Sequence, residues 1–277
     1  MLELSGNFQK YWKYQYISEN MTDKNIDEML KSDLTDKVAL ITGGAQRVGA
    51  MTARLLHAAG ANLVLHYRGS RQQALELQTE LNTQRAESVI LIQADLLDTS
   101  KLKPIITQSI EHWGRLDILV NNASSFYPTP IGKTTENDWD DLIGSNMKAP
   151  FFLSQAAAPH LAQHNGCIIN IVDIHAQRPM QGHSIYNMAK AGLAMLVKTL
   201  AFELGPDVRV NGVAPGAIMW PDNNMDDITK QRIVSKTYLK RKGTAEDIAR
   251  TVLFLAANAD YIAGQIIAVD GGRSLYL

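Results

Sequence analysis

Tyr186 and Lys190 form a pair whose spacing favours acid–base chemistry. They lie within Ser184-Ile-Tyr-Asn-Met-Ala-Lys-Ala-Gly192, a stretch with helical character, and a separation of four residues places both side chains on one helix face. A phenol with a pKa of about 10 exchanges protons poorly near neutral pH, whereas a neighbouring ammonium group lowers that pKa. We therefore expect Tyr186 to exchange a proton with a reacting group. The alternative is a surface tyrosine and lysine without chemistry.

A second chemical signal is the glycine-rich turn Gly43-Gly-Ala-Gln-Arg47-Val-Gly49. It follows the apolar run Val38–Thr42 directly and precedes a predicted helix that begins near Arg47. Glycines let the backbone turn sharply and approach a pyrophosphate, and a helix N-terminus adds free N–H groups and partial positive charge. The order of strand, turn and helix predicts a dinucleotide site. An ordinary tight turn is the alternative.

The choice of dinucleotide depends on the end of the second apolar run, where an acidic residue would bind the ribose 2′-hydroxyl of NAD. The chain has Leu65-His-Tyr-Arg-Gly-Ser-Arg71 there, whose guanidinium and hydroxyl groups suit a 2′-phosphate. Together with Arg47, these residues favour NADPH over NADH. The alternative is that Arg68 and Arg71 only solvate a loop.

The elements that position these residues follow from the hydrophobic pattern. From Lys37 onward, apolar runs rich in Val and Ile alternate with amphipathic segments such as Leu193-Leu196-Val197-Leu200. The seven runs are 38–42, 61–66, 88–93, 116–120, 167–172, 208–213 and 265–269. This alternation predicts an α/β fold, a doubly wound (Rossmann) three-layer sandwich with a seven-stranded parallel sheet. Ligands are expected beyond the carboxyl ends of the strands.

The length of 277 residues fits one such domain preceded by an extension. The first 35 residues crowd aromatic side chains between Tyr11 and Tyr16 without a clear period, whereas the remainder shows one regime of composition. We predict a single Rossmann-type domain over residues 36–277. Residues 1–35 are predicted to be an N-terminal extension that is either docked or disordered.

The composition excludes several classes of partner. With 27 Lys and Arg against 28 Asp and Glu, the net charge is -1, so no overall positive field exists to hold nucleic acid. No apolar run approaches the roughly 18 residues that cross a bilayer, and the N-terminus lacks a secretory signal. We expect a cytoplasmic protein that binds neither nucleic acid nor membrane, with no metal site. The single cysteine, Cys167, cannot form an intramolecular disulfide, and its predicted buried strand argues against a catalytic thiol.

Landmarks in chain order resemble the short-chain dehydrogenase/reductase superfamily. After the glycine turn come Asp95, Asn121-Asn-Ala-Ser124, Asn146 in a long helix, the Tyr186/Lys190 pair and Pro215-Gly216. The resemblance implies that Tyr186 is the proton donor, that Lys190 binds the nicotinamide ribose and lowers the tyrosine pKa, and that Asn146 positions a water of a proton relay. It also implies that Asp95 binds adenine and that Asn122 lies near the adenosine ribose. The expected cofactor contacts are Gly43, Arg47, Val48, His66, Tyr67, Arg68, Ser70, Asp95, Leu96, Asn122, Ala123, Ser124, Asn146, Lys190, Pro215 and Gly216.

Two departures from the general family pattern resemble the bacterial type of pteridine reductase. Arg47 replaces the middle glycine of Gly-x-x-x-Gly-x-Gly, and Asp173 replaces the usual serine 13 residues before the tyrosine. The segments 122–130 and 269–275 and the pair His66-Tyr67 also resemble that group. The resemblance implies reduction of a dihydropterin or dihydrofolate by NADPH to the tetrahydro form, and leaves reduction of the fully oxidised pterin open.

The same resemblance implies a substrate site formed by Arg47, Ser124, Phe126, Asp173 and Tyr186. Phe126 would hold the flat pterin against the nicotinamide while Ser124 and Tyr186 reach its ring edge. Asp173 would pass a proton through Tyr186, and with Lys190 these two residues form the expected catalytic set. This set is the expected proton source for a fully oxidised pterin, and a water is the expected source for a dihydropterin. The alternatives are that Asp173 only caps the next segment and that Phe126 is a core aromatic.

Two other functions are open from the residues. One is another NADPH-dependent carbonyl reductase of the superfamily, such as a 3-oxoacyl-thioester reductase, against which Asp173 and Arg47 argue. The other is a non-catalytic NADPH-binding protein, against which the intact Tyr186/Lys190 pair argues. The resemblance also implies a homotetramer built on the long helices around Asn146 and Tyr186.

Overall fold

The computed structural model describes residues 32–218 and 226–275. Its centre is a seven-stranded parallel sheet in the order β3-β2-β1-β4-β5-β6-β7. The predicted doubly wound α/β sandwich is therefore confirmed. Most of the predicted N-terminal extension, residues 1–31, lies outside the described residues. Its last part belongs to the folded body, because Leu34 is buried and its N–H donates to the Ala59 carbonyl at 2.7 Å.

The strands are short and largely buried. Those in the middle of the sheet, β1, β4 and β5, are buried at every residue, since helices cover both faces. Their sequences are therefore mostly apolar rather than alternating, with Asn121 at the end of β4 and Asn170 within β5 as the buried polar residues. The strands are β1 (Val38–Ile41), β2 (Asn62–Tyr67), β3 (Val89–Gln93), β4 (Ile118–Asn121), β5 (Cys167–Ile171), β6 (Arg209–Pro215) and β7 (Ile266–Val269).

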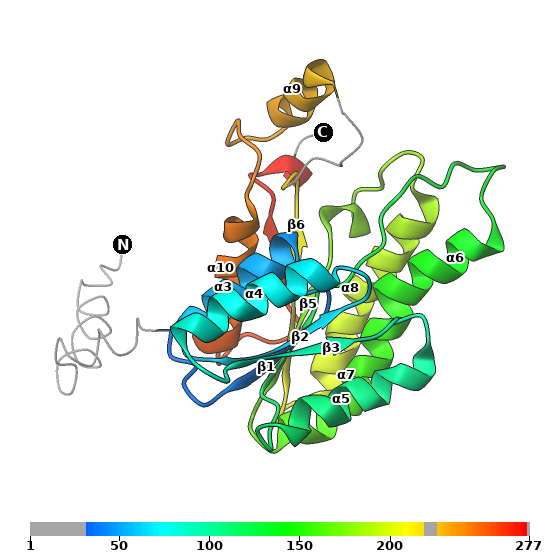
Figure 1. The fold of residues 1–277 in the computed structure, drawn as a ribbon. Helices are drawn as coiled ribbons and strands as arrows, with labels where there is room; N and C mark the ends of the chain where they lie inside the picture. The colour runs from blue at the N-terminus through cyan, green and yellow to red at the C-terminus, as the bar shows by residue number, and fades with distance from the viewer. Residues whose placement is uncertain (1–31, 219–225, 276–277) are drawn as a thin grey trace, which may run out of the picture.

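Two layers of helices enclose the sheet (Figure 1). One layer holds α3 (Arg47–Ala58), α4 (Arg71–Gln84) and α10 (Ala245–Ala257), and the other holds α5 (Leu102–Glu111), α7 (Ala149–Ala162) and α8 (Ser184–Leu204). Successive residues of β1 point to opposite faces, so Ala39 and Ile41 join the first apolar core while Val38 and Leu40 join the second.

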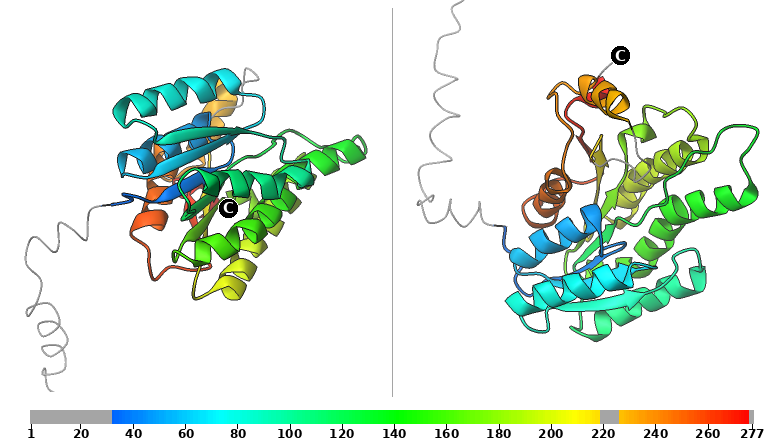
Figure 2. Two further views of the ribbon diagram at one scale, coloured as in Figure 1. Left: turned by 60° about the horizontal axis from the view of Figure 1, so that its bottom comes forward. Right: turned by 45° about the horizontal axis from the view of Figure 1, so that its top comes forward.

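The connections at the carboxyl edge of the sheet carry shorter elements. A π-helical turn, Gly144–Lys148, joins α6 (Glu136–Ile143) to α7, and η1 (Thr99–Lys101) precedes α5. The short helix η3 (Ile174–Ala176) follows β5, and η4 (Arg273–Leu275) ends the described chain. The helix α9 (Asp227–Ser235) stands apart from both layers near η4 (Figure 2, right).

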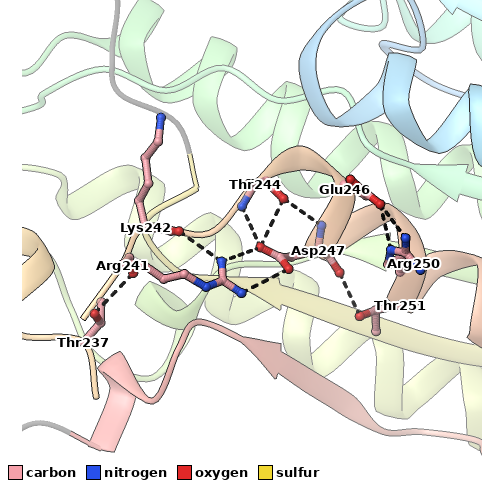
Figure 3. A network of polar contacts seen from close by, with 8 residues as sticks. All are labelled: Thr237, Arg241, Lys242, Thr244, Glu246, Asp247, Arg250 and Thr251. Atoms are coloured by element: carbon pink, nitrogen blue, oxygen red, sulfur yellow. Dashed lines mark hydrogen bonds and ion pairs between the residues drawn. The ribbon is translucent and has the colours of Figure 1, made fainter. Parts of the chain in front are cut away.

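The start of α10 is held by a polar network (Figure 3). The Asp247 N–H donates to Thr244 Oγ1 at 3.2 Å, the Thr244 N–H donates to the Asp247 carboxylate at 2.8 Å, and Arg241 donates to the same carboxylate at 3.0 Å. Thr135 and Asp138 form the same kind of capping box at α6. These two helices therefore satisfy first-turn N–H groups with their own side chains.

Across residues 32–218 and 226–275, the structure has no helix that is both long enough and apolar enough to cross a membrane.

Candidate active site

The predicted functional residues gather where the central strands end. Gly43 lies two residues after β1, Asn122 directly follows β4, Asp173 lies two residues after β5, and Pro215 ends β6. In a parallel sheet these carboxyl ends share one edge, and the strand order reverses between β1 and β4. That reversal point is where an open α/β sheet forms its ligand crevice.

Tyr186 and Asp173 form the central hydrogen bond of the site. Tyr186, in the first turn of α8, is 5% exposed, and its hydroxyl donates to Oδ2 of Asp173 at 2.8 Å. The other carboxylate oxygen, Oδ1, accepts the N–H of His175 at 2.8 Å and so caps η3. Asp173 therefore has both the capping role and the contact with Tyr186, which were considered above as alternatives.

The pKa of Tyr186 is raised well above its ordinary value, first by burial and then by the Asp173 carboxylate. Lys190 donates from Nζ to the Ile171 carbonyl at 2.8 Å, and this nitrogen lies 5.7 Å from the centroid of the Tyr186 ring. The expectation that Lys190 lowers the tyrosine pKa is therefore wrong for this arrangement, because the negative charge is in direct contact with the hydroxyl. Tyr186 is a neutral phenol.

Lys190 is 2% exposed, and burial lowers its pKa to about 8, against the opposing effect of Asp173. An ammonium group has three protons, and the bond to Ile171 uses one. Within the described part of the chain, the other two protons are available for the hydroxyl groups of a ligand.

Asn146 fixes the segment that follows β4. Its Oδ1 accepts from the Ser124 hydroxyl at 2.7 Å, and its Nδ2 donates to the carbonyls of Ser125 and Leu142 at 2.9 and 3.0 Å. Asn146 is fully buried inside the π-helical turn, a local widening that often marks functional positions in helices. The two predicted residues Ser124 and Asn146 are thus joined directly.

Phe126 stands at the mouth of the site. Its ring meets the Tyr186 ring edge to face with 4.9 Å between centroids, and it stacks on the His183 ring at 4.9 Å and 14°. With 45% exposure, Phe126 is not a core aromatic, so that alternative is overturned. The sequence had assigned no role to His183, since neither its type nor its spacing reveals a stacking partner.

The glycine turn packs backbone against backbone on the segment after β4. Gly43 has a φ of +60°, and a Cβ atom there would lie 3.0 Å from Cα of Ala123. A Cβ atom on Gly49 would collide with the Gly43 carbonyl oxygen. Asn122 ties the two segments together, since its Nδ2 donates to the carbonyls of Thr42 and Gly43 at 2.8 and 3.0 Å.

Thr42 is a residue that the sequence reasoning missed. Its hydroxyl oxygen accepts the N–H groups of Asn122 and Ala123 at 2.9 and 3.0 Å, and the hydroxyl donates to the Val120 carbonyl at 3.3 Å. Thr42 is 1% exposed. The one available signal was a hydroxyl residue at the end of an apolar run, directly before the turn.

Arg273 is a second missed residue. Burial lowers the pKa of this guanidinium, while the carboxylates of Asp173 and Asp270 act to raise it. The guanidinium of Arg273, in η4, therefore interacts electrostatically with the Asp173 carboxylate. In the sequence, Arg273 stood out only as part of segment 269–275, which resembles the pteridine reductases.

The chain's own residues fit a dinucleotide at the helix N-termini. The residue before α3, Gln46, forms no side-chain capping bond, and the first turn of α3 has no acidic residue. Ser70, before α4, forms no such bond either. The capping boxes of α6 and α10 show the contrast. The starts of α3 and α4 therefore leave N–H groups for the anionic part of a ligand.

The remaining predicted cofactor residues divide into outer and inner positions. Arg47, Arg68 and Asp95 are exposed, and Asp95 accepts the Leu97 N–H at 3.0 Å. Ser70, Ala123, Pro215 and Gly216 are half-buried, and the Gly216 N–H donates to the Val269 carbonyl at 3.1 Å. The inner positions are Val48, which is partly buried, and His66, Tyr67 and Leu96, which are buried.

The described residues place no three His, Cys, Asp or Glu side chains together as a metal site would need.

Comparison with known proteins identifies the family. Residues 43–274 match the family described as enoyl-(acyl carrier protein) reductase. The chain is 36% identical to pteridine reductase 1 of Leishmania tarentolae over 281 residues, covering 87% of this chain and 97% of that protein. It is also 36% identical to the 3-oxoacyl-[acyl-carrier-protein] reductase FabG of Staphylococcus epidermidis over 241 residues, covering 86% and 98%. For FabG of Thermotoga maritima the identity is 32% over 244 residues.

The chain belongs to the short-chain dehydrogenase/reductase family. It is an oxidoreductase that uses a nicotinamide cofactor. The pterin-reducing and thioester-reducing relatives reach the same identity, so overall similarity does not choose between their substrates.

Proposed function

We propose that the protein is an NADPH-dependent pteridine reductase, with residues 36–277 as its single catalytic domain. The observation that carries the proposal is the hydrogen bond of 2.8 Å between Tyr186 and Asp173, beside the half-exposed ring of Phe126. The substrate is a dihydropterin or dihydrofolate, which is reduced to the tetrahydro form.

The Asp173 carboxylate suits a pterin better than a 3-oxoacyl thioester. A ketone under reduction develops negative charge on its oxygen and needs hydrogen-bond donors there, so a carboxylate beside Tyr186 opposes that charge. A pterin presents ring N–H and amino groups, which donate to a carboxylate. A thioester reductase of this family has a serine at this position. The aspartate found here therefore favours a pterin over a thioester.

The aromatic cluster suits a flat heterocycle. Phe126 is braced on one side by His183 and touches Tyr186 at its edge, so its ring is held in place although it is 45% exposed. Burying an aromatic face against a flat ligand is favourable, and offset stacking adds about 0.5–1.5 kcal/mol. Ser124, exposed and bonded to Asn146, lies on the same segment as Phe126.

The preference for NADPH rests on the end of β2. Arg68 and Ser70 follow that strand, where an acidic residue would favour NAD. Arg68 is exposed, and Ser70 precedes the uncapped start of α4. A 2′-phosphate there gains a guanidinium, a hydroxyl group and helix N–H groups.

The catalytic residues control the proton. When bound, NADPH supplies a hydride to the pyrazine ring of the pterin. With a fully oxidised pterin, Tyr186 donates a proton to the ring nitrogen, and the phenolate left beside the Asp173 carboxylate is unstable, as the raised tyrosine pKa indicates. With a dihydropterin, a water molecule supplies the proton. Asp173 is half-buried and passes a replacement proton from solvent to Tyr186. Lys190 orients the cofactor ribose with its free N–H protons.

We further propose that the enzyme is a homotetramer whose long helices pack together. The exposed apolar residues of α7 and α8 include Phe151, Phe152, Met195 and Phe202, the last 90% exposed. Beside them lies an apolar hollow of about 450 Å³ lined by Met147, Phe151 and Leu196 among others. Surface of this kind is rarely left in contact with water. Sedimentation equilibrium tests this assembly, and a stable monomer at micromolar concentration would contradict it.

The decisive experiment measures NADPH oxidation with dihydrobiopterin, dihydrofolate, dihydromonapterin and an acetoacetyl thioester in parallel. We expect turnover with a pterin or folate and little with the thioester. Thioester turnover without pterin turnover would overturn the proposal. The Asp173→Ser variant is the matched control, and we expect it to lose pterin reduction. Full pterin activity in that variant would remove Asp173 from the proton path.

A further inference from the structure

His66 lies between two separate segments of the proposed cofactor site. It is the fifth residue of β2 and is 2% exposed. The Gly43 N–H donates to its Nδ1 at 3.2 Å, and its Nε2 lies 3.1 Å from the Ala94 carbonyl oxygen. Gly43 opens the glycine turn after β1, whereas Ala94 follows β3 and directly precedes Asp95. One imidazole ring therefore bonds to both segments.

The partners of His66 fix its charge and its tautomer. A backbone N–H can only donate, so Nδ1 must be an acceptor without a proton. A carbonyl oxygen can only accept, so Nε2 must carry the proton. The ring is therefore neutral. Burial is the largest influence on its pKa and lowers it to about 4, so the ring stays neutral near physiological pH, with the nearby Asp95 as an opposing influence.

The bond to His66 also decides what Gly43 does. Its N–H is committed to the imidazole, so pyrophosphate recognition falls to the later N–H groups of the turn and to the start of α3. The backbone of His66 adds a second tie, because the Gly44 N–H donates to the His66 carbonyl at 2.9 Å. Two hydrogen bonds thus fix the turn to β2, and the imidazole ring connects the turn to the end of β3.

We propose that His66 is a positioning residue that couples the pyrophosphate turn to the adenine segment, so that one neutral imidazole sets the spacing between the two halves of the dinucleotide site. The inference depends on the proposed placement of the dinucleotide. His66 was expected above to contact the cofactor; the inference gives its ring a different role, which it exerts through Gly43 and Ala94.

The test separates the two bonds with conservative variants of the full-length protein. His66→Asn carries a carbonyl oxygen near the position of Nδ1 and retains the bond from Gly43. His66→Gln reaches further with its amide nitrogen and retains the bond to Ala94. His66→Leu removes both. Dissociation constants for NADPH and for adenosine 2′-monophosphate are measured by calorimetry, and hydrogen exchange of residues 43–49 is measured without ligand.

We expect His66→Leu to weaken NADPH binding about tenfold, since two buried hydrogen bonds that position the site are lost. His66→Asn should restore slow exchange in the turn but not the affinity for adenosine 2′-monophosphate, and His66→Gln should show the reverse. The KM for NADPH should rise together with the dissociation constant, and kcat at saturating NADPH should fall by a smaller factor. NADPH binding by His66→Leu within about twofold of the wild type, or the same pattern in both amide variants, would overturn the inference.

His57→Leu is the matched control. His57 lies in the last turn of α3, outside the proposed cofactor site, and is also a buried histidine, with 4% exposure. Its Nε2 lies 2.8 Å from the Ser88 hydroxyl oxygen. The His57→Leu variant should have a lower melting temperature and an unchanged NADPH affinity.

If His66→Leu does not fold, the two amide variants still decide the question. If the wild type binds NADH instead of NADPH, the proposed function fails, and the same series with NADH and adenosine 5′-monophosphate tests His66.

Discussion

The two halves of the proposed site, one for catalysis and one for the cofactor phosphates, consist of different kinds of residues. The proposed catalytic cluster, defined by Asp173, Tyr186 and Lys190, consists of ionisable side chains, and Tyr186 and Lys190 each interact electrostatically with Asp173. The phosphate cradle, defined by Thr42, Gly43, His66 and Asn122, consists of neutral groups that hold backbone to backbone. In the first half, Tyr186 and Lys190 can change charge, and Phe126 beside them is half-exposed. In the second half, the imidazole of His66 stays neutral and the hydrogen bonds join backbone segments.

The contrast shows how the enzyme divides its work. Moving a proton needs groups whose charge can change, so the catalytic cluster accepts the electrostatic cost of a carboxylate beside a buried phenol. Holding a dinucleotide needs N–H groups at fixed positions, so the cradle is made of residues that do not titrate near neutral pH. Substitutions of Asp173 and Tyr186 should therefore change kcat, and those in the second half should change cofactor affinity.

Tyr186→Phe should have the largest effect. It removes the proton donor and leaves the cradle intact, so kcat with a fully oxidised pterin should fall by about 10²–10⁴ while the NADPH dissociation constant stays within about twofold. Steady-state kinetics and fluorescence titration measure the two quantities. A parallel loss of NADPH binding would break the division between the halves.

Gly49→Ala should come next, with its effect in the other half. The added methyl group collides with the Gly43 carbonyl oxygen, so the turn must shift and NADPH affinity should fall by roughly 10- to 100-fold, with kcat at saturation little changed. Gly166→Ala is the control, because its methyl group would lie 2.5 Å from the Asp117 carbonyl oxygen at the opposite edge of the sheet. The control should destabilise the fold without changing affinity; equal affinity losses in both variants would contradict the cradle's local role.

Thr42→Val should have a moderate effect on stability. It leaves the N–H groups of Asn122 and Ala123 without their acceptor, at a cost of about 2 kcal/mol in the free energy of unfolding. Thr52→Val is an isosteric control, since the Thr52 hydroxyl is buried without a hydrogen-bond partner among the described residues. Urea titration should show a lower free energy of unfolding for Thr42→Val and an unchanged one for Thr52→Val. Equal losses would mean that Thr42 only packs.

The pH dependence of the catalytic cluster should give the smallest effect. Because the pKa of Lys190 is about 8, its ammonium charge is lost as the pH rises through that value, and kcat/KM should decline a few-fold above it. Lys190→Arg should move the decline to higher pH, and Asp173→Asn should move it lower, because the carboxylate raises the lysine pKa.

The contribution of Lys190 to stability has the opposite trend. Its folded-state pKa of about 8 lies below the 10.5 of an exposed lysine, so the unfolded chain binds more protons between these values. Stability due to this group therefore rises with pH across that window. Denaturation measured from pH 8 to 10 in the wild type and in Lys190→Met should differ in slope; identical slopes would place Lys190 outside the linkage.

The fold was predictable because buried parallel strands leave a plain signal. Each predicted run overlaps an observed strand within about two residues, since strands covered on both faces need apolar residues throughout. The glycine turn was found for a similar reason, because Gly43 and Gly49 occupy positions that no side chain can share. The spacing of Tyr186 and Lys190 predicts that they share one helix face, and their place in the order of landmarks distinguishes them from a chance surface pair.

The rest depends on contacts between segments that are distant in sequence. Thr42, His183 and Arg273 act on Asn122, Phe126 and Asp173 through the packing of separate strands and loops, which no local pattern encodes. The tyrosine pKa was mispredicted for the same reason. The pKa of Tyr186 is raised first by burial and then by the contact with Asp173, and sequence spacing shows neither.

Cys167 gives the protein an internal reporter of its own opening. It is the chain's only cysteine, it is 2% exposed between β4 and β6, and burial raises its pKa to about 11. A thiol in this state does not react with alkylating reagents until the central strands separate. The rate at which the Cys167 thiol is labelled therefore measures how often the central strands separate. A bound dinucleotide that joins the segments after β1 and β4 should lower this labelling rate.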